Sequence, residues 1–294
     1  MDRTSEQTIL EKVFDKIFNV LKVSIYGSDG TNLQRIKTDV DGKLQVDVLI
    51  IPNKNYGLDV ARSNIAGQIS VNKFGRNPDV DIGTEDIWGA GGIFIEPTSA
   101  TTVAVVSSSV ADTAAGTGAR TVSVVGLNGS YVEVTETVTL NGTVAVNTTN
   151  SYFFINRIIV LTAGTGGTNA GTITTSWTGG GTPVGPTIQI GKGQTQFCLY
   201  QIPASYTGYL SSYGASYNGG GTSNVLIELF AKPLGGVYNL KGSINLTQAG
   251  TTFGRRLFDT PLKFTEKTIV KLTATSDTVN SDVIGNFDII LVGN

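Results

Sequence analysis

The chain has 294 residues, of which 15% are charged and 40% are hydrophobic, and its net charge is -2. A charged fraction this low, together with a slightly negative net charge, gives no basic surface that would attract nucleic acid, so we expect no DNA binding. Histidine is absent, which excludes Ser-His and Cys-His catalysis, most zinc sites and the usual proton shuttle near neutral pH.

The single cysteine, Cys198, lies in an alternating apolar run. One cysteine cannot form an intrachain disulfide, so stability must come from packing or association. Such a cysteine is ordinarily a small buried core residue, and a nucleophile is the alternative. No apolar run has the length of a membrane-spanning helix, and the N-terminus is acidic where a signal peptide needs a basic start. We therefore expect synthesis in the cytoplasm and no membrane partner.

Residues 1–22 are predicted to form an amphipathic helix, because apolar residues recur there at spacings of three and four. Four of them also fit the core positions of a heptad repeat: Leu10, Phe14, Ile17 and Leu21. An apolar face this broad needs a partner surface, either on the chain's own β region or on another subunit. We expect these four residues to be the partner-binding element.

Residues 23–95 are expected to form a β-hairpin arm followed by an ordered connecting loop. The runs Val23–Tyr26, Leu33–Thr38 and Leu44–Ile51 alternate apolar with polar residues and are separated by Ser-Asp-Gly and Asp-Gly turn signals. This meander is too small to be stable alone, so it must dock on the main domain or on another copy. A polar loop should follow, and Gln68–Phe74 is expected to be one more short strand.

The stretch from Phe74 to Gly92 is predicted to be an ordered polar loop. The Asn-Pro-Asp sequence around Pro78 is a strong turn signal, so the chain should change direction there. Phe74 and Trp88 would hold the loop at its two ends, and we expect Phe74, Pro78 and Trp88 to be structurally important. Between them lie four carboxylates: Asp79, Asp81, Glu85 and Asp86. They form either a solvated acidic turn or a calcium site, although their spacing fits no EF-hand.

Residues 96–294 are predicted to be mainly β, folded as an antiparallel β-sandwich like a jelly roll. Alternating runs are broken by Gly, Asn and Thr turns about every eight to twelve residues, a rhythm typical of such folds. The runs are 101–107, 120–125, 131–140, 153–162, 172–177, 196–202, 209–217, 225–231, 237–246 and 287–292. The region forms either one sandwich or two, at 96–185 and 186–294.

Three features of the β region have both a functional and a structural interpretation. The clusters Gly164–Gly171 and Gly179–Gly185 invite comparison with phosphate loops, but neither leads into Lys-Ser/Thr or a helix, so we expect turns. Arg255 and Arg256 beside Phe258 either anchor an interface or lie in an exposed loop. Tyrosines concentrated in the C-terminal part form either a sugar-binding or interface patch or half-buried strand positions. They are Tyr200, Tyr206, Tyr209, Tyr213, Tyr217 and Tyr238.

Several strings in the chain resemble those of a known family. They are Phe74–Asp81, Gly83–Asp86, Trp88, Gly116–Val122, Glu136–Thr143, Thr149–Tyr152, Gly166–Gly171, Pro203–Leu210 and Pro233–Val237. Together they resemble a family of tailed-bacteriophage virion structural proteins, over roughly residues 23–294. That family is defined by membership of the virion and has no chemical motif. The resemblance implies a particle component located on the capsid surface, the neck or the tail.

These observations lead us to expect a structural virion protein, either a capsid-surface or a neck decoration protein. It would act by multivalent association with capsid, neck or tail subunits, as a homo-oligomer that we expect to be a trimer. The alternative is a tail-fibre or receptor-binding protein that contacts a host surface glycan. A glycosidase would need two carboxylates across a cleft, for which Glu133, Glu136 and Asp259 are candidates only by elimination. We therefore expect no enzyme, no cofactor and no metal.

Overall fold

The computed structural model describes residues 26–28, 33–35, 56–179, 184–218, 223–247 and 252–294. The chain divides into two compact units, Met1–Lys54 and Asn55–Asn294. No helix within the described ranges has both the length and the apolar character needed to cross a membrane.

The first unit contains a short antiparallel pair, β1 (Tyr26–Ser28) and β2 (Leu33–Arg35). This pair confirms the first hairpin of the predicted arm. The predicted helix at 1–22 lies outside the described residues, as does the third run of the meander, 44–51. The partner-binding residues Leu10, Phe14, Ile17 and Leu21 lie outside them as well.

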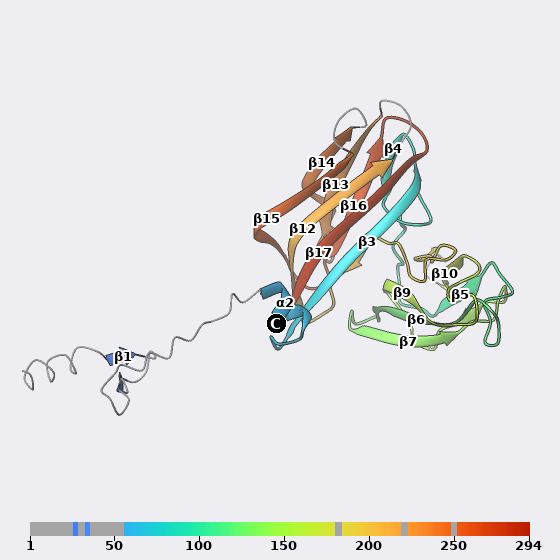
Figure 1. The fold of residues 1–294 in the computed structure, drawn as a ribbon, viewed down its shortest axis with the longest axis horizontal. Coiled ribbons are helices and arrows are strands. Elements are labelled where there is room, and N and C mark those ends of the chain that lie inside the picture. The colour runs from blue at the N-terminus through green and yellow to red at the C-terminus, as the bar shows by residue number, and fades with distance from the viewer. Residues whose placement is uncertain (1–25, 29–32, 36–55, 180–183, 219–222, 248–251) are drawn as a thin grey trace, which may run out of the picture. The chain divides into compact units, whose positions relative to one another are not determined.

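The second unit contains a jelly roll of two four-stranded antiparallel sheets, which lie one over the other in Figure 1. One sheet has the order β15-β12-β17-β3 and the other β11-β16-β13-β14. The strands are β3 (Gln68–Val80), β11 (Leu199–Gln201), β12 (Tyr206–Asn218), β13 (Asn224–Lys232), β14 (Asn239–Thr247), β15 (Phe253–Phe264), β16 (Ile269–Ser276) and β17 (Ser281–Gly293). Apart from the β13–β14 hairpin, each successive strand of the jelly roll lies in the opposite sheet, which is the connectivity of a jelly roll. The predicted fold class is confirmed.

Alternating side chains fill the space between the two sheets. Along β17, every second residue is buried: Val283, Gly285, Phe287, Ile289 and Leu291. The facing strand β13 buries Val225, Ile227, Leu229 and Ala231. Since successive side chains of a strand point to opposite faces, this alternation places one face of each strand in the core and leaves the other outside.

The chain between β3 and β11 leaves the jelly roll and forms a smaller β structure, which we call the inserted sandwich (Figure 1). It has two three-stranded sheets, β10-β5-β8 and β7-β6-β9. Its strands are β5 (Val103–Ser107), β6 (Ala119–Leu127), β7 (Glu133–Thr139), β8 (Val146–Asn147), β9 (Phe154–Ala163) and β10 (Ile173–Trp177). The largest side chains of its own core are aromatic: Trp88, Phe94, Tyr152, Phe154, Trp177 and Phe197.

The jelly roll and the inserted sandwich do not follow one another along the chain. From the sequence, the sandwich is predicted to start at residue 96. The structure has a jelly-roll strand before that residue, because β3 pairs with β17 from Gln68 to Val80. The core of the inserted sandwich includes Ile188, Phe197 and Leu199, beyond residue 185. The first strand of the jelly roll is therefore separated from the second by the whole insertion.

The turn predicted at Asn77-Pro78-Asp79 is wrong, because β3 continues through these residues to Val80. Val283 pairs with Asn77 whereas Ser281 pairs with Val80, so Pro78 lies at an irregularity in the pairing. β3 is also the outermost strand of its sheet. Proline has no N–H group to donate and is accommodated at such edge irregularities.

Two elements before and after β3 were also not expected. The helix α2 (Tyr56–Ala61) lies in the region predicted to be a polar loop. The short strand β4 (Gly83–Asp86) follows β3, and next to it the backbone amide of Ile87 donates to the carbonyl of Leu272 in β16. The connecting loop is thus tied to the second sheet of the jelly roll.

Candidate functional site: a polar cleft beside strand β3

The predicted structural residues of the connecting loop lie in different environments. Trp88 is only 4% exposed, and its indole Nε1 donates to the carbonyl of Gly92 at 3.0 Å. Phe74 is half-buried, and its carbonyl accepts the amide of Phe197 at 2.9 Å. Pro78 is exposed on β3. Trp88 and the backbone of Phe74 thus both contact the core of the inserted sandwich.

The loop carboxylates are engaged separately. Asp86 is buried with one oxygen 2.6 Å from Lys271 Nζ, while its other oxygen accepts the amide of Phe94 at 2.8 Å. Burial raises the pKa of Asp86, although the positive charge of Lys271 acts in the opposite direction. Glu85 accepts the amide of Gly92 at 2.8 Å. In the described part of the chain, no three Asp, Glu, Cys or His side chains form a group that could hold a metal ion, and the calcium interpretation of the loop stays untested.

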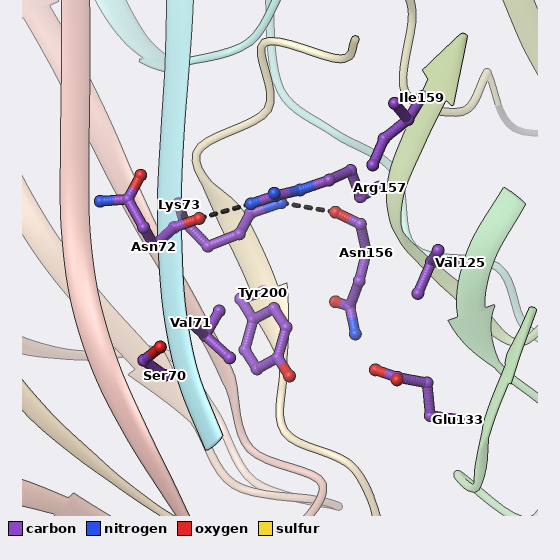
Figure 2. A pocket seen from close by; sticks show the side chains of 10 residues that line it. All are labelled: Ser70, Val71, Asn72, Lys73, Val125, Glu133, Asn156, Arg157, Ile159 and Tyr200. Atoms are coloured by element: carbon purple, nitrogen blue, oxygen red, sulfur yellow. Dashed lines mark hydrogen bonds between the residues drawn. The ribbon is translucent and has the colours of Figure 1, made fainter. Parts of the chain in front are cut away.

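A cleft of about 270 Å³ lies where β3 and β11 of the jelly roll approach β6, β7 and β9 of the inserted sandwich (Figure 2). Its lining comes from five strands. The residues are Ser70, Val71, Asn72 and Lys73 of β3, Val125 of β6, Glu133 of β7, Asn156, Arg157 and Ile159 of β9, and Tyr200 of β11.

Hydrogen bonds hold the walls of the cleft together. Lys73 donates to the carbonyl of Asn156, and Arg157 Nη2 donates to the carbonyl of Asn72, so β3 and β9 are linked twice (Figure 2). The side-chain amide of Asn156 donates to the carbonyl of Gln201 at 3.1 Å and accepts its N–H at 3.0 Å. β9 is therefore fixed against both β3 and β11.

Lys73 is the most deeply buried cation of the cleft, with 2% of its surface exposed. Its Nζ lies 5.4 Å from the centre of the Phe197 ring. Burial, and after it the positive charge of Arg157, lower the pKa of Lys73 to about 7, although Cys198 acts in the opposite direction. Lys73 therefore loses its proton near neutral pH instead of near the ordinary 10.5.

Three polar side chains face the cleft with unused hydrogen-bonding capacity. Tyr200 is 4% exposed, and among the described residues its hydroxyl has no hydrogen-bond partner. Glu133 is reached by solvent yet partly enclosed, and this enclosure raises its pKa. Burial lowers the pKa of Arg157. Burial likewise raises the pKa of Tyr200, and the nearby charge of Glu133 raises it further while Arg157 opposes it.

Only one of the three carboxylates considered for a glycosidase lies in this cleft. Glu133 and Glu136 are an odd number of positions apart on β7, so they point to opposite faces of the strand. Glu136 accepts the amides of Thr149 at 2.7 Å and Asn150 at 2.8 Å. Asp259 is exposed on β15 of the jelly roll. The structure does not bring these carboxylates together as a pair.

The cysteine and several of the predicted tyrosines are core residues. Cys198 is fully buried, and burial raises the pKa of its thiol well above the ordinary value, which suits a core residue and not a nucleophile. Tyr213 and Tyr217 belong to the jelly-roll core, whereas Tyr238 packs against the core of the inserted sandwich. These tyrosines are therefore divided between two cores, and of the six only Tyr200 lines the cleft.

The arginine pair lies on the outside of β15. Arg255 Nη2 is 3.7 Å from a carboxylate oxygen of Asp288 and donates to Ser212 Oγ at 3.1 Å. Arg256 lies over the ring of Phe258, at 5.4 Å from its centre. Both guanidinium groups have partners within the chain, and their role in an interface stays a prediction.

Lys73 and Arg157, the two cations of the cleft, were not singled out from the sequence. The sequence contains one indication of the cleft, the position of Lys73. It stands two residues from Val71 and two from Gly75, and so occupies an inward position of an alternating strand. A lysine at such a position requires either a buried partner or a cavity.

We expect the substitution Lys73→Met to change how stability depends on pH. The pKa of Lys73 is lowered in the folded state, so the wild type loses stability as pH falls from 10.5 toward about 7, by at most about 1.4 kcal/mol per pH unit. A methionine side chain cannot take up a proton, so the variant lacks this pH dependence. The free energy of unfolding of the wild type should therefore rise relative to that of the variant as pH rises through this range. Denaturant unfolding at several pH values measures this, with the exposed Lys241→Met as control. If the free energy of unfolding depends on pH in the same way for wild type and Lys73→Met, the pKa of Lys73 is not lowered in the folded state.

No protein-family model and no curated protein matches this chain. Among solved structures, one that is similar is described as the structure of infectious bursal disease virus, Gt strain. The alignment covers 77% of this chain and 73% of that chain, with 10% sequence identity and a TM-score of 0.19. At that TM-score the likeness does not establish a shared fold.

Proposed function

We propose that this protein is a structural component of a tailed-phage virion, a capsid-surface or neck decoration protein that acts by multivalent protein–protein association. The sequence strings that resemble virion structural proteins support this proposal. The jelly roll also supports it, because this architecture is common in viral capsid proteins, although a fold alone does not determine a function.

The observation that carries the proposal is the outward face of the sheet β15-β12-β17-β3. The strand register places Phe253 and Ile284 on either side of Ser216, and Leu257 lies on the same face of β15. These side chains are 59%, 45% and 66% exposed, respectively. Large apolar side chains gathered on one face are typical of surfaces that bind another protein.

The affinity of a single copy through such a face would be modest, and the affinity of an oligomer that binds through several copies at once would be high. Apolar burial contributes about 25 cal/mol per Å², and stable interfaces bury more than about 1,000 Å². Much of this free energy is offset by the loss of translational and rotational freedom. A homo-oligomer, in the simplest case a trimer, that contacts several capsid, neck or tail subunits at once would gain from multivalency.

Localisation on the particle tests the proposal directly. Gold-labelled antibody or a particle reconstruction should place copies over the shell or at the neck. Copies at the tail tip would favour the tail-fibre alternative, and purified particles without this protein would contradict a structural role. We propose further that the protein is not an enzyme. Release of reducing ends from host-envelope polysaccharide by the purified protein would contradict that part.

We expect a variant without Met1–Lys22 to keep its cooperative thermal transition but to lose particle attachment or self-association. The reason is that the predicted helix has more apolar surface than a single sheet edge would cover. Attachment is measured by co-sedimentation with particles and self-association by analytical ultracentrifugation. Replacing the apolar residues Leu10, Phe14, Ile17 and Leu21 by Ser should have the same effect. The matched control replaces Glu11, Lys12, Asp15 and Lys16 by Ser. Attachment unchanged by the deletion would contradict the role of the helix.

A further inference from the structure

The cleft beside β3 collects polar groups that keep unused hydrogen-bonding capacity within the described chain. Tyr200 comes from β11, Glu133 from β7 and Arg157 from β9, and all three line the same space in Figure 2. No hydrogen bond or ion pair in the described residues engages the carboxylate of Glu133, and Arg157 makes a single hydrogen bond, to the carbonyl of Asn72. Although Tyr200 is only 4% exposed as a residue, its hydroxyl is not one of the buried side-chain atoms that lack a partner, so the cleft leaves this hydroxyl open to a ligand group.

We propose that this cleft binds one neutral sugar unit of a glycan through adjacent hydroxyl groups. The lining contains a guanidinium that only donates hydrogen bonds, a carboxylate that accepts them, and a phenol that does both. A sugar hydroxyl both donates and accepts. Two or three neighbouring hydroxyls can therefore satisfy Arg157, Glu133 and Tyr200 together, with Glu133 as the charged acceptor.

Simple ions do not fit the same lining. An inorganic anion placed against Arg157 would be repelled by Glu133. Lys73 does not offset this repulsion, because it is only 2% exposed and its Nζ donates to the carbonyl of Asn156. A metal cation placed against Glu133 would be repelled by Arg157. A zwitterion such as an amino acid could pair with both charges. However, Arg157 is half-buried, and a fully charged ligand group must lose more hydration than a hydroxyl on coming against it.

The size and the apolar part of the cleft agree with a single ring. A volume of about 270 Å³ is slightly below the range of pockets that hold drug-sized ligands. Val71, Val125 and Ile159 give the lining an apolar surface that the C–H groups of a sugar ring can contact. The polar groups then fix the orientation of the ring, as they do in other small-molecule sites.

This site adds a recognition activity to the proposed function and does not depend on it. A particle protein without a sugar site would still be found on the shell or neck. A sugar-binding protein that is absent from particles would still bind glycosides in solution. The two tests can therefore fail separately.

Saturation-transfer NMR of the full chain tests the proposal with the methyl glycosides of glucose, galactose, mannose and N-acetylglucosamine, and with glycine and alanine as zwitterionic probes. At least one glycoside should bind saturably. Tyr200→Phe removes one hydrogen bond, and Glu133→Gln replaces a charged acceptor by a weaker neutral one, so each should weaken binding about threefold to tenfold. The matched controls Tyr209→Phe and Glu228→Gln change a tyrosine and a glutamate outside the cleft and should leave binding unchanged.

Three results would overturn the sugar site. They are no saturable binding of any glycoside, equal binding by wild type and both cleft variants, or binding of glycine and alanine in place of the glycosides. A thermal transition is recorded for every variant. Should Tyr200→Phe fail to fold, Glu133→Gln still decides the question, because solvent reaches Glu133 and its carboxylate makes no contact that holds the fold together.

Discussion

Replacing Trp88 by alanine is expected to lower the free energy of unfolding by roughly 3 to 5 kcal/mol, the usual cost of removing a buried large aromatic side chain. The indole is 4% exposed and packs edge-on against Phe94, at 5.5 Å between ring centres, and against Phe197, at 5.9 Å. Alanine would leave a cavity among these rings and remove the donor to the carbonyl of Gly92.

Urea unfolding followed by circular dichroism measures this loss. Phe253→Ala is the matched control, because Phe253 is a large aromatic residue exposed on β15, and its removal should change stability by no more than about 0.5 kcal/mol. If Trp88→Ala unfolds at the wild-type urea concentration, the connecting loop does not stabilise the inserted sandwich as we infer.

The jelly roll was predictable because most of its strands have one face in the core and one outside. β13 and β17 alternate between buried and less buried residues, β12 does so up to Ser211, and runs read from the sequence fall on all three strands. β16 was missed for the opposite reason. Almost all of its residues are buried, since Ile269 and Leu272 belong to different cores on its two sides. A strand buried on both faces loses its period of two.

The connectivity could not be predicted from local patterns. β3 pairs with β17, for example Asn72 with Asp288, across the whole length of the insertion. The Asn-Pro-Asp string is a turn signal by its own chemistry, yet at an edge strand the same residues extend the sheet through an irregularity. Tertiary pairing decides between these outcomes.

The cleft could not be predicted from the sequence either, because it also depends on tertiary pairing. Lys73 and Asn156 are 83 positions apart, and the bond between them depends on how β3 and β9 approach. Glu133 was named from the sequence only as one of several carboxylates. Its neighbours Arg157 and Tyr200 become visible as a group only when five strands come together.

The glycine cluster Gly164–Gly171 has a structural explanation that also could not be predicted. The amides of Ala170 and Gly171 do bind an anion, but it is the carboxylate of Asp112, at 2.8 Å from each. A side chain at Gly118 would come within 2.1 Å of the same carboxylate, so glycine is required there by close approach. The expectation of turn chemistry is thus correct, and the loop's N–H groups already have their partner.

Asp112→Ala is therefore expected to lower the free energy of unfolding by roughly 3 to 5 kcal/mol, because it leaves several buried donors without an acceptor. Asp112 is fully buried and accepts four hydrogen bonds, from Ser107 Oγ at 2.6 Å, from the amide of Ala119 at 2.7 Å, and from the two amides described above. The bonds join the loop before β6 to the loop before β10, so their loss should loosen the part of the inserted sandwich where these two loops meet.

The effect of Asp112 should also depend on pH, with a defined sign. Burial by itself would raise the pKa of Asp112, but the hydrogen bonds from Ser107 and the three amides outweigh it and hold the pKa below the ordinary value. The stabilisation is thus complete above the unfolded-state pKa of about 3.9 and is lost as pH falls through the lower folded-state pKa. The difference between wild type and Asp112→Ala, measured by urea unfolding, should shrink at acid pH. The exposed Asp79→Ala should differ from wild type by at most about 0.5 kcal/mol. A loss for Asp112→Ala no larger than that of Asp79→Ala would show that the loops are held by other contacts.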